Sequence, residues 1–242
     1  MILEVMGRLG TDAMAVGPRD VAGGVKLLQK GAAEAGIALL SANLETAKGR
    51  AVFPASVVLE RGGLRVGVIG VSTADLRVAE ARAYLGAKLT AAAPAPAVQK
   101  AAAALKGKAD VIVLLGRLTT REQREVVAAV DLPLALIGSS GQAPSAPGRI
   151  GRALAYEGGF RGQVLQRVDL RVSEPGGGFR DGAEREIVPA PPGLKTPNDA
   201  SARAIYLDAF KAIDPALDAL LEPVRSEEEL EARKKGREKA AE

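Results

Sequence analysis

Apolar and polar positions along the first part of the chain alternate between helical spacing and short continuous runs. Residues 21–36 carry apolar side chains at intervals of three or four, which predicts a helix that stops at Gly36. Asp20 precedes this helix and is expected to cap it. The apolar run over 37–40 predicts a buried strand, and 96–105 predicts a second helix with a proline in its first turn.

Two further runs have the character of sheet strands. Residues 53–60 and 64–71 are separated by Gly62-Gly63, which predicts a β-hairpin because paired glycines accept the positive φ angles of a tight turn. The continuous apolar run over 110–115 is typical of a central parallel strand buried on both faces.

The next helix is expected to begin with a capping box. The Thr120 hydroxyl would cap it and Gln123 would reach back. A short apolar run over 134–137 predicts another buried strand. Two more strands are expected over 153–156 and 164–172.

The pattern changes near residue 173, where proline and glycine become frequent. Apolar residues over 200–213 predict an amphipathic helix, and the mixed charges over 226–242 predict a solvated helical end. We therefore predict three parts: an α/β domain over 1–172, a linker over 173–199 and a helical, charged tail over 200–242.

The amino-acid composition restricts the possible chemistry of the protein more than it restricts its fold class. A hydrophobic fraction of 47% over 242 residues is enough for a sizeable core, and the aromatic fraction of 3% suits small aliphatic layers. The net charge of +4, without interleaved aromatic residues, does not predict nucleic-acid binding. The sequence shows no apolar run of membrane-spanning length and no signal peptide at Met1, and the compartment stays open.

Two residue types do not occur. The absence of cysteine excludes disulfides and thiolate metal sites. The absence of histidine excludes an imidazole base, a Ser-His-Asp triad and histidine metal ligands. A carboxylate site for magnesium or calcium remains conceivable.

Several segments together resemble the bifunctional 5'-nucleotidase/metallophosphoesterase family, whose members use calcineurin-like phosphoesterase chemistry. The segments, in order, are LGTDAMAVGPRD (9–20), LLSANL (39–44), VGVIGV (66–71), DVIVLLGRL (110–118) and IGSSGQ (137–142). The resemblance covers about residues 5–172. It implies a metallophosphoesterase-type four-layer α/β sandwich, and in the family two divalent metals activate a water for attack on phosphorus.

The metal ligands of the family are replaced in this sequence. Pro18 stands where the family has a metal-binding asparagine, and Arg19 stands where it has a phosphate-contacting histidine. Arg117 replaces a ligand histidine, and Ser140 and Gln142 replace two more. No metal ligand and no catalytic residue is therefore expected, and no cofactor is predicted.

The first ligand loops of the family, together with its first core strand and helix, would lie upstream of Met1. Either the gene start is placed too late, or the protein is trimmed. A late start would restore two loops and perhaps an export signal, but it would leave Pro18, Arg19 and Arg117 in place. The non-catalytic interpretation holds in both cases.

The replaced positions allow two interpretations. Arg19 and Arg117 would line one cleft of the resembled fold and could bind phosphate or a nucleotide-like anion without metal, helped by a backbone nest at Ser139, Ser140 and Gln142. Alternatively, a disused site has drifted and the Gly-Ser segment is an ordinary turn.

The function expected from the sequence is that of a non-catalytic binding or structural module with a degenerate nucleotidase-like fold. The alternative is a metal-dependent phosphohydrolase acting in nucleotide catabolism, as the resemblance implies. An open sheet edge or the tail could pair with a second copy or a protein partner. Nucleic acid and a membrane span are not expected.

Overall fold

The computed structural model describes residues 2–138, 148–157, 164–168 and 202–206. Its helices are α1 (Ile2–Arg8), α2 (Val25–Glu34), α3 (Val78–Gly86), α4 (Pro94–Leu105) and α5 (Thr120–Ala129). Its strands are β1 (Ala13–Ala15), β2 (Ala38–Leu40), β3 (Leu44–Thr46), β4 (Ser56–Arg61), β5 (Leu64–Ser72), β6 (Leu89–Ala91), β7 (Val111–Arg117), β8 (Leu134–Gly138), β9 (Gly148–Ile150), β10 (Ala153–Glu157), β11 (Val164–Val168) and β12 (Ala202–Tyr206). None of the described helices is long and apolar enough to cross a membrane.

A six-stranded sheet forms the centre of the fold, in the order β4-β5-β7-β8-β10-β9. Strands β5, β7, β8 and β10 run parallel, and β4 and β9 pair antiparallel at the two ends. Ile69 of β5 and Ile112 of β7 are fully buried, as expected for parallel strands covered on both faces. The predicted central strand over 110–115 is confirmed.

The β4–β5 hairpin turns at Gly62 and Gly63. Their φ angles are 57° and 75°. Two consecutive positive φ angles are what a two-residue hairpin turn requires, and glycine adopts them without a steric penalty. The hairpin predicted from the paired glycines is confirmed.

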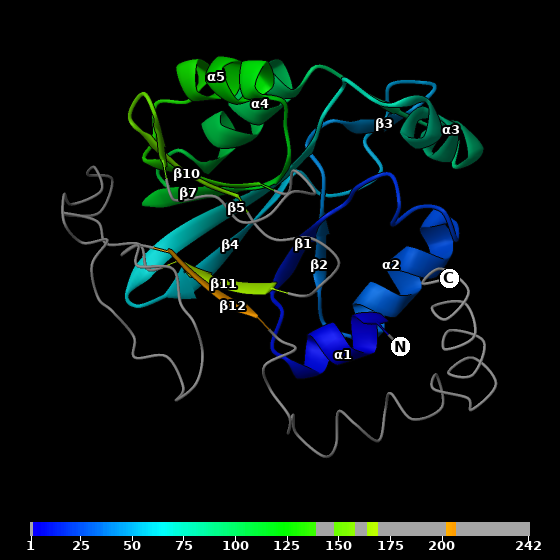
Figure 1. The fold of residues 1–242 in the computed structure, drawn as a ribbon, viewed down its shortest axis with the longest axis horizontal. Helices are drawn as coiled ribbons and strands as arrows, with labels where there is room; N and C mark the ends of the chain where they lie inside the picture. Colours follow the sequence, from blue (N-terminus) through cyan, green and yellow to red (C-terminus); the bar gives the residue numbers. More distant parts are fainter. Residues whose placement is uncertain (1, 139–147, 158–163, 169–201, 207–242) are drawn as a thin grey trace, which may run out of the picture.

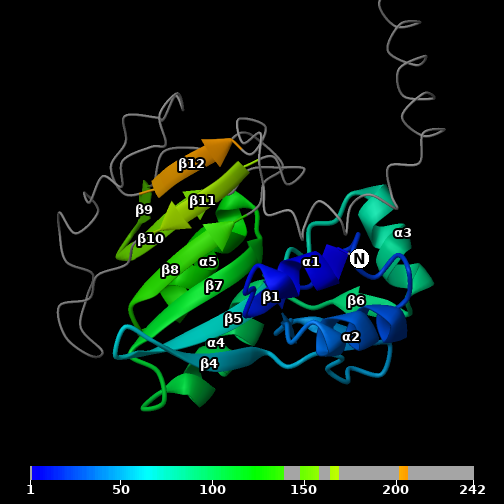
Figure 2. The ribbon, with the colours of Figure 1, turned by 90° about the horizontal axis from the view of Figure 1, so that it is seen from below.

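The elements stack in the order of a four-layer sandwich (Figures 1 and 2). Helices α4 and α5 cover one face of the six-stranded sheet, where Val98, Leu105 and Val126 pack with Ile69 and Ile112. The short parallel pair β1–β2 and the antiparallel pair β11–β12 lie on the side away from α4 and α5. Helices α1 and α2 follow as the last layer.

The N-terminal part of the fold, residues 2–53, contains most of a second apolar cluster. Leu28 and Ala32 of α2 pack with Leu39 of β2 and with Phe53. Leu28 and Ala32 are four residues apart and therefore lie on one face of α2, and this apolar face packs against β2.

Strand β2 crosses very close to β5. A Cβ added to Gly70 would lie 2.3 Å from the Leu40 carbonyl oxygen. Ala42 N donates to Gly70 O at 2.8 Å, which fixes the crossing. Glycine is therefore required at this point because no side chain fits between the two backbones.

The cap predicted for α2 is wrong. The helix begins at Val25 after Gly24, whose φ of 96° and lack of a side chain leave no side-chain cap. Asp20 Oδ2 instead accepts a hydrogen bond from Gly17 N at 2.7 Å. A turn over 18–23 separates this carboxylate from the helix, so it stabilises the loop after β1.

The predicted helix over 200–213 is wrong at Ala202–Tyr206. This segment is β12 and pairs antiparallel with β11 along its whole length. Backbone pairing with a strand distant in sequence has overridden the local helical spacing. The remaining positions of the predicted linker and tail lie outside the described residues.

Candidate functional site

The carboxyl ends of β5 and β7 meet the loop that follows β1. Ser72 ends β5 and stands beside Arg117, which ends β7. Ser72 Oγ donates to Val16 O at 3.1 Å, which ties the end of β1 to the end of β5. Two strand ends and the residue that follows a third strand therefore meet here, and the carboxyl ends of strands are the usual location of ligand sites in open α/β sheets.

Tyr84 joins α3 to this position. Its hydroxyl lies 2.7 Å from Ser72 Oγ, and the residue is 1% exposed. Since the single Ser72 hydroxyl proton goes to Val16 O, Tyr84 is the donor of this hydrogen bond. Burial raises the pKa of the Tyr84 phenol to about 12, so it stays neutral at ordinary pH.

Asn43 holds the end of β5 through its side-chain amide. Its Oδ1 accepts from Ser72 N at 2.9 Å, and its Nδ2 donates to Ser72 O at 2.6 Å and to Ala92 O at 2.9 Å. Asn43 is fully buried. These bonds satisfy a buried amide and explain structurally why the segment 39–44 needs an asparagine.

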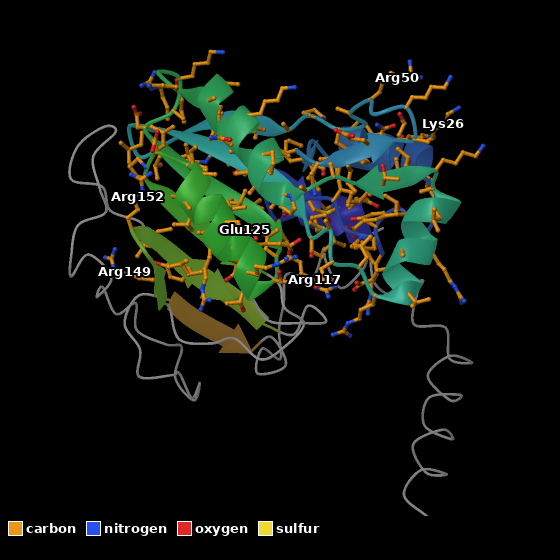
Figure 3. All side chains as sticks on the ribbon, turned by 90° about the horizontal axis from the view of Figure 1, so that it is seen from above. Lys26, Arg50, Arg117, Glu125, Arg149 and Arg152 are labelled. Atoms are coloured by element: carbon orange, nitrogen blue, oxygen red, sulfur yellow. The ribbon has the colours of Figure 1, made fainter. Side chains whose placement is uncertain are left out.

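Arg117 forms an ion pair with Glu80 of α3. The side chains are 35% and 16% exposed, respectively. Glu80 Oε2 also accepts from Arg77 N at 3.0 Å. Burial disfavours the carboxylate, but the Arg77 N–H and the Arg117 guanidinium outweigh it and lower the pKa of Glu80. Figure 3 shows Arg117 at the junction between the six-stranded sheet and the N-terminal part.

The loop after β1 carries Arg19 and Asp20. Burial raises the pKa of Asp20, although the hydrogen bond from Gly17 N works in the opposite direction. The charges of Asp20 and Glu80 add to the rise in the pKa of the Tyr84 phenol, and the charge of Arg117 opposes it. The Arg19 side chain is exposed and makes no hydrogen bond or ion pair with the described residues.

The structure shows where two of the predicted site residues lie. It places Arg117 at the strand ends and Arg19 in the loop after β1, which is tied to the same ends through Val16. Ser139, Ser140 and Gln142 lie outside the described residues. Sequence reasoning missed Glu80, whose one signal was its place in the first turn of a helix that we had not predicted.

The donors at these strand ends do not fit a pair of divalent metals. Pro18 has no donor atom, Arg117 is a cation, and the Ser72 hydroxyl is committed to Val16 and Tyr84. A two-metal clamp needs several anionic or neutral donors directed at one point. In the described part of the chain, no group of three or more histidine, cysteine, aspartate or glutamate side chains could hold a metal ion.

A buried carboxylate, Glu122, lies next to the site but serves α5. It accepts from Thr73 Oγ1 at 2.7 Å, Ala74 N at 2.9 Å and Thr119 N at 2.8 Å. The capping box of α5 is therefore Thr119 with Glu122, one position before the predicted Thr120 with Gln123. This cap joins α5 to the loop after β5.

Comparisons by sequence find no matching family model and no matching curated protein. Comparisons by structure do find similar proteins. The chain superposes on a Thermus thermophilus sulfate thiohydrolase, SoxB, with a TM-score of 0.68 and 18% identity, covering 92% of this chain and 38% of that one. It superposes on a calcineurin-like phosphoesterase, YfkN, from Bacillus subtilis with a TM-score of 0.67 and 14% identity, covering 93% and 72%.

A putative 5'-nucleotidase from Staphylococcus aureus, solved in complex with alpha-ketoglutarate, gives a TM-score of 0.62 at 16% identity, covering 92% of this chain and 43% of that one. The chain therefore spans 38% and 43% of the SoxB and nucleotidase chains. At these identities the comparisons show the fold, which is that of the 5'-nucleotidases and calcineurin-like metallophosphoesterases. The predicted α/β sandwich of this type is confirmed.

Proposed function

We propose that this chain is a non-catalytic binding module that keeps the metallophosphoesterase fold and holds an oxyanion, such as a phosphate or a nucleotide phosphate, at the ends of β1, β5 and β7. Arg19 and Arg117 supply the positive charge. Ser139, Ser140 and Gln142 remain part of the proposal as a backbone nest. Guanidinium groups are suited to this task because their fork of N–H donors matches two oxygens of a phosphate or carboxylate.

The Arg117–Glu80 ion pair is the observation that carries the proposal. The resemblance puts a metal-binding histidine at this position, and a guanidinium there repels a metal ion while it attracts an anion. Within the fold this guanidinium is directed at a carboxylate, that of Glu80.

The alternative function, metal-dependent hydrolysis of nucleotides, would need a carboxylate-based metal site. Asp20 is the carboxylate carried by the loop after β1, and its Oδ2 is already bound to Gly17 N. One carboxylate alone cannot hold a two-metal clamp. Metal-dependent hydrolysis would therefore need metal ligands from outside the described residues.

Metal content and turnover measured on one sample test the proposal. The purified chain is incubated with Mn²⁺ and Zn²⁺, dialysed, and analysed by elemental mass spectrometry and by phosphate release from AMP. We expect substoichiometric metal and no turnover. Two metals per chain with turnover that falls in Asp20→Ala would overturn the non-catalytic assignment.

A further inference from the structure

We propose that Glu80 is an internal ligand of the anion site, which occupies Arg117 until an external oxyanion displaces it. This inference rests on the proposed function, because it assigns the regulation of the same site. It makes Glu80 a residue that sets the affinity and selectivity of the site rather than a residue that binds the ligand.

The contacts of Glu80 are those of a bound anion. Its Oε1 accepts from Arg117 Nη1, and its Oε2 accepts from Arg77 N at 3.0 Å. The bond from Arg77 N is the capping box at the start of α3, so the Arg117 guanidinium is the donor that an external ion can contest. A phosphate or carboxylate ligand would compete with Glu80 for this guanidinium.

The Glu80 side chain can leave Arg117 while α3 keeps its position. Tyr84, one turn further along α3, holds the helix through its hydroxyl contact with Ser72 and is buried. The opposite face of α3 is exposed, with Val78 at 71% and Leu85 at 68%. Exchange at Arg117 therefore needs a change of the Glu80 side-chain rotamer, while the helix stays anchored.

The ion pair is accessible enough for exchange. Arg117 is 35% exposed, so an ion from solvent can reach its guanidinium while Glu80 is bound. An internal ligand lowers the apparent affinity in proportion to the time for which the site is open. If the site is open for about one tenth of the time, removing the charge of Glu80 tightens anion binding about tenfold.

The experiment compares Glu80→Gln with Glu125→Gln in the full chain. Glutamine keeps an oxygen for Arg77 N, so the helix cap survives. Glu125 is an exposed residue of α5 that pairs with Arg121, so its substitution changes the net charge equally without touching the Arg117–Glu80 pair (Figure 3). Inorganic phosphate and acetate are titrated separately by calorimetry, and thermal unfolding confirms that each variant is folded.

We expect Glu80→Gln to bind phosphate, acetate or both about tenfold more tightly than the unmodified chain, and Glu125→Gln to bind as the unmodified chain does. The ion that gains affinity identifies the class of ligand. The double variant Glu80→Gln with Arg117→Ala should lose the gain.

Two results separate this inference from the proposed function. If Arg117→Ala weakens phosphate binding but Glu80→Gln leaves it unchanged, or changes it no more than Glu125→Gln does, Glu80 is no internal ligand and the anion site stands. If neither anion binds any variant, the anion site itself is refuted, and the internal ligand with it.

Discussion

The hydroxyl groups of Tyr84 and Ser72 lie 2.7 Å apart and join α3 to the carboxyl end of β5. Both residues are buried, at 1% and 4% exposure. The Ser72 hydroxyl in turn donates a hydrogen bond to Val16 O at the end of β1. This chain of hydrogen bonds therefore fixes the positions of α3, β5 and the end of β1 relative to one another.

Removing the Tyr84 hydroxyl should weaken the fold modestly. We expect Tyr84→Phe to lower the free energy of unfolding by about 1 kcal/mol, the usual net value of one hydrogen bond. Urea unfolding at neutral pH measures it. An unchanged midpoint would mean that the Tyr84–Ser72 contact contributes nothing to α3 docking.

The same phenol should make the fold sensitive to alkali. Folding raises the pKa of Tyr84 from 10.0 to about 12, so the folded state favours the neutral phenol. Its contribution to stability is complete below pH 10 and is lost as the pH rises toward 12. Unfolding free energies at pH 8 and pH 11 should differ less in Tyr84→Phe than in the unmodified chain.

Glu122 should be among the most sensitive side chains of α5. Glu122→Ala leaves the donors of Thr73, Ala74 and Thr119 without a partner, and we expect a loss of roughly 3 kcal/mol. The exposed Glu125 on the same helix offers the matched control, since Glu125→Ala should change stability by less than about 0.5 kcal/mol. Equal effects in both variants would rule out a structural role for the cap.

Acid should act on the fold through the same carboxylate. Burial disfavours the charged form of Glu122, but the hydrogen bonds from Thr119, Thr73 and Ala74 prevail, so its pKa lies below the usual 4.5. The stabilisation is present above pH 4.5 and is lost as the pH falls through the lowered pKa. Stability measured between pH 6 and pH 3 should fall less steeply in Glu122→Gln.

The crossing of β2 over β5 should tolerate no side chain at position 70. Gly70→Ala places its Cβ 2.3 Å from Leu40 O, and we expect a loss of about 3 kcal/mol or more. Gly86, at the end of α3, has open space around it, and Gly86→Ala should be neutral or stabilising. Thermal unfolding of the two variants compares the sites, and a tolerated Gly70→Ala would contradict the close crossing.

Arg19 provides the most direct test of the anion site. Its guanidinium is unengaged by the described residues, so Arg19→Ala should leave stability unchanged while it weakens phosphate binding about tenfold, the value of one charged hydrogen bond. Arg50→Ala removes an equally exposed charge from a distant turn and should have no effect (Figure 3). Equal weakening in the two variants would indicate that the anion responds only to net charge.

The parts of the fold with local causes could be predicted from the sequence. Two adjacent glycines at 62 and 63 dictate their own hairpin turn, and the apolar run over 110–115 can be stable only inside a covered sheet. The capping box of α5 was placed one residue late. Thr119 with Glu122 and Thr120 with Gln123 have the same spacing, and only the helix start distinguishes them.

The parts that depend on distant partners could not be predicted. Glu80 reaches Arg117 because the chain returns through α3, and no pattern along the sequence links the two positions. Ala202–Tyr206 forms a strand because β11 pairs with it, although its apolar spacing also suits a helix. The motifs include Arg117, whereas Glu80, the carboxylate that pairs with it, lies outside them.

The crossing at Gly70 also has a consequence for synthesis. Leu40 leaves the ribosome about 30 residues before Gly70, a delay of roughly 2–6 s at the usual rates of translation. Throughout this interval the apolar pair Leu39-Leu40 has no strand to cross. In this interval β2 has its partners β1 and α2 but lacks β5, so the N-terminal layers can be completed only after the chain has been made as far as the later hairpin.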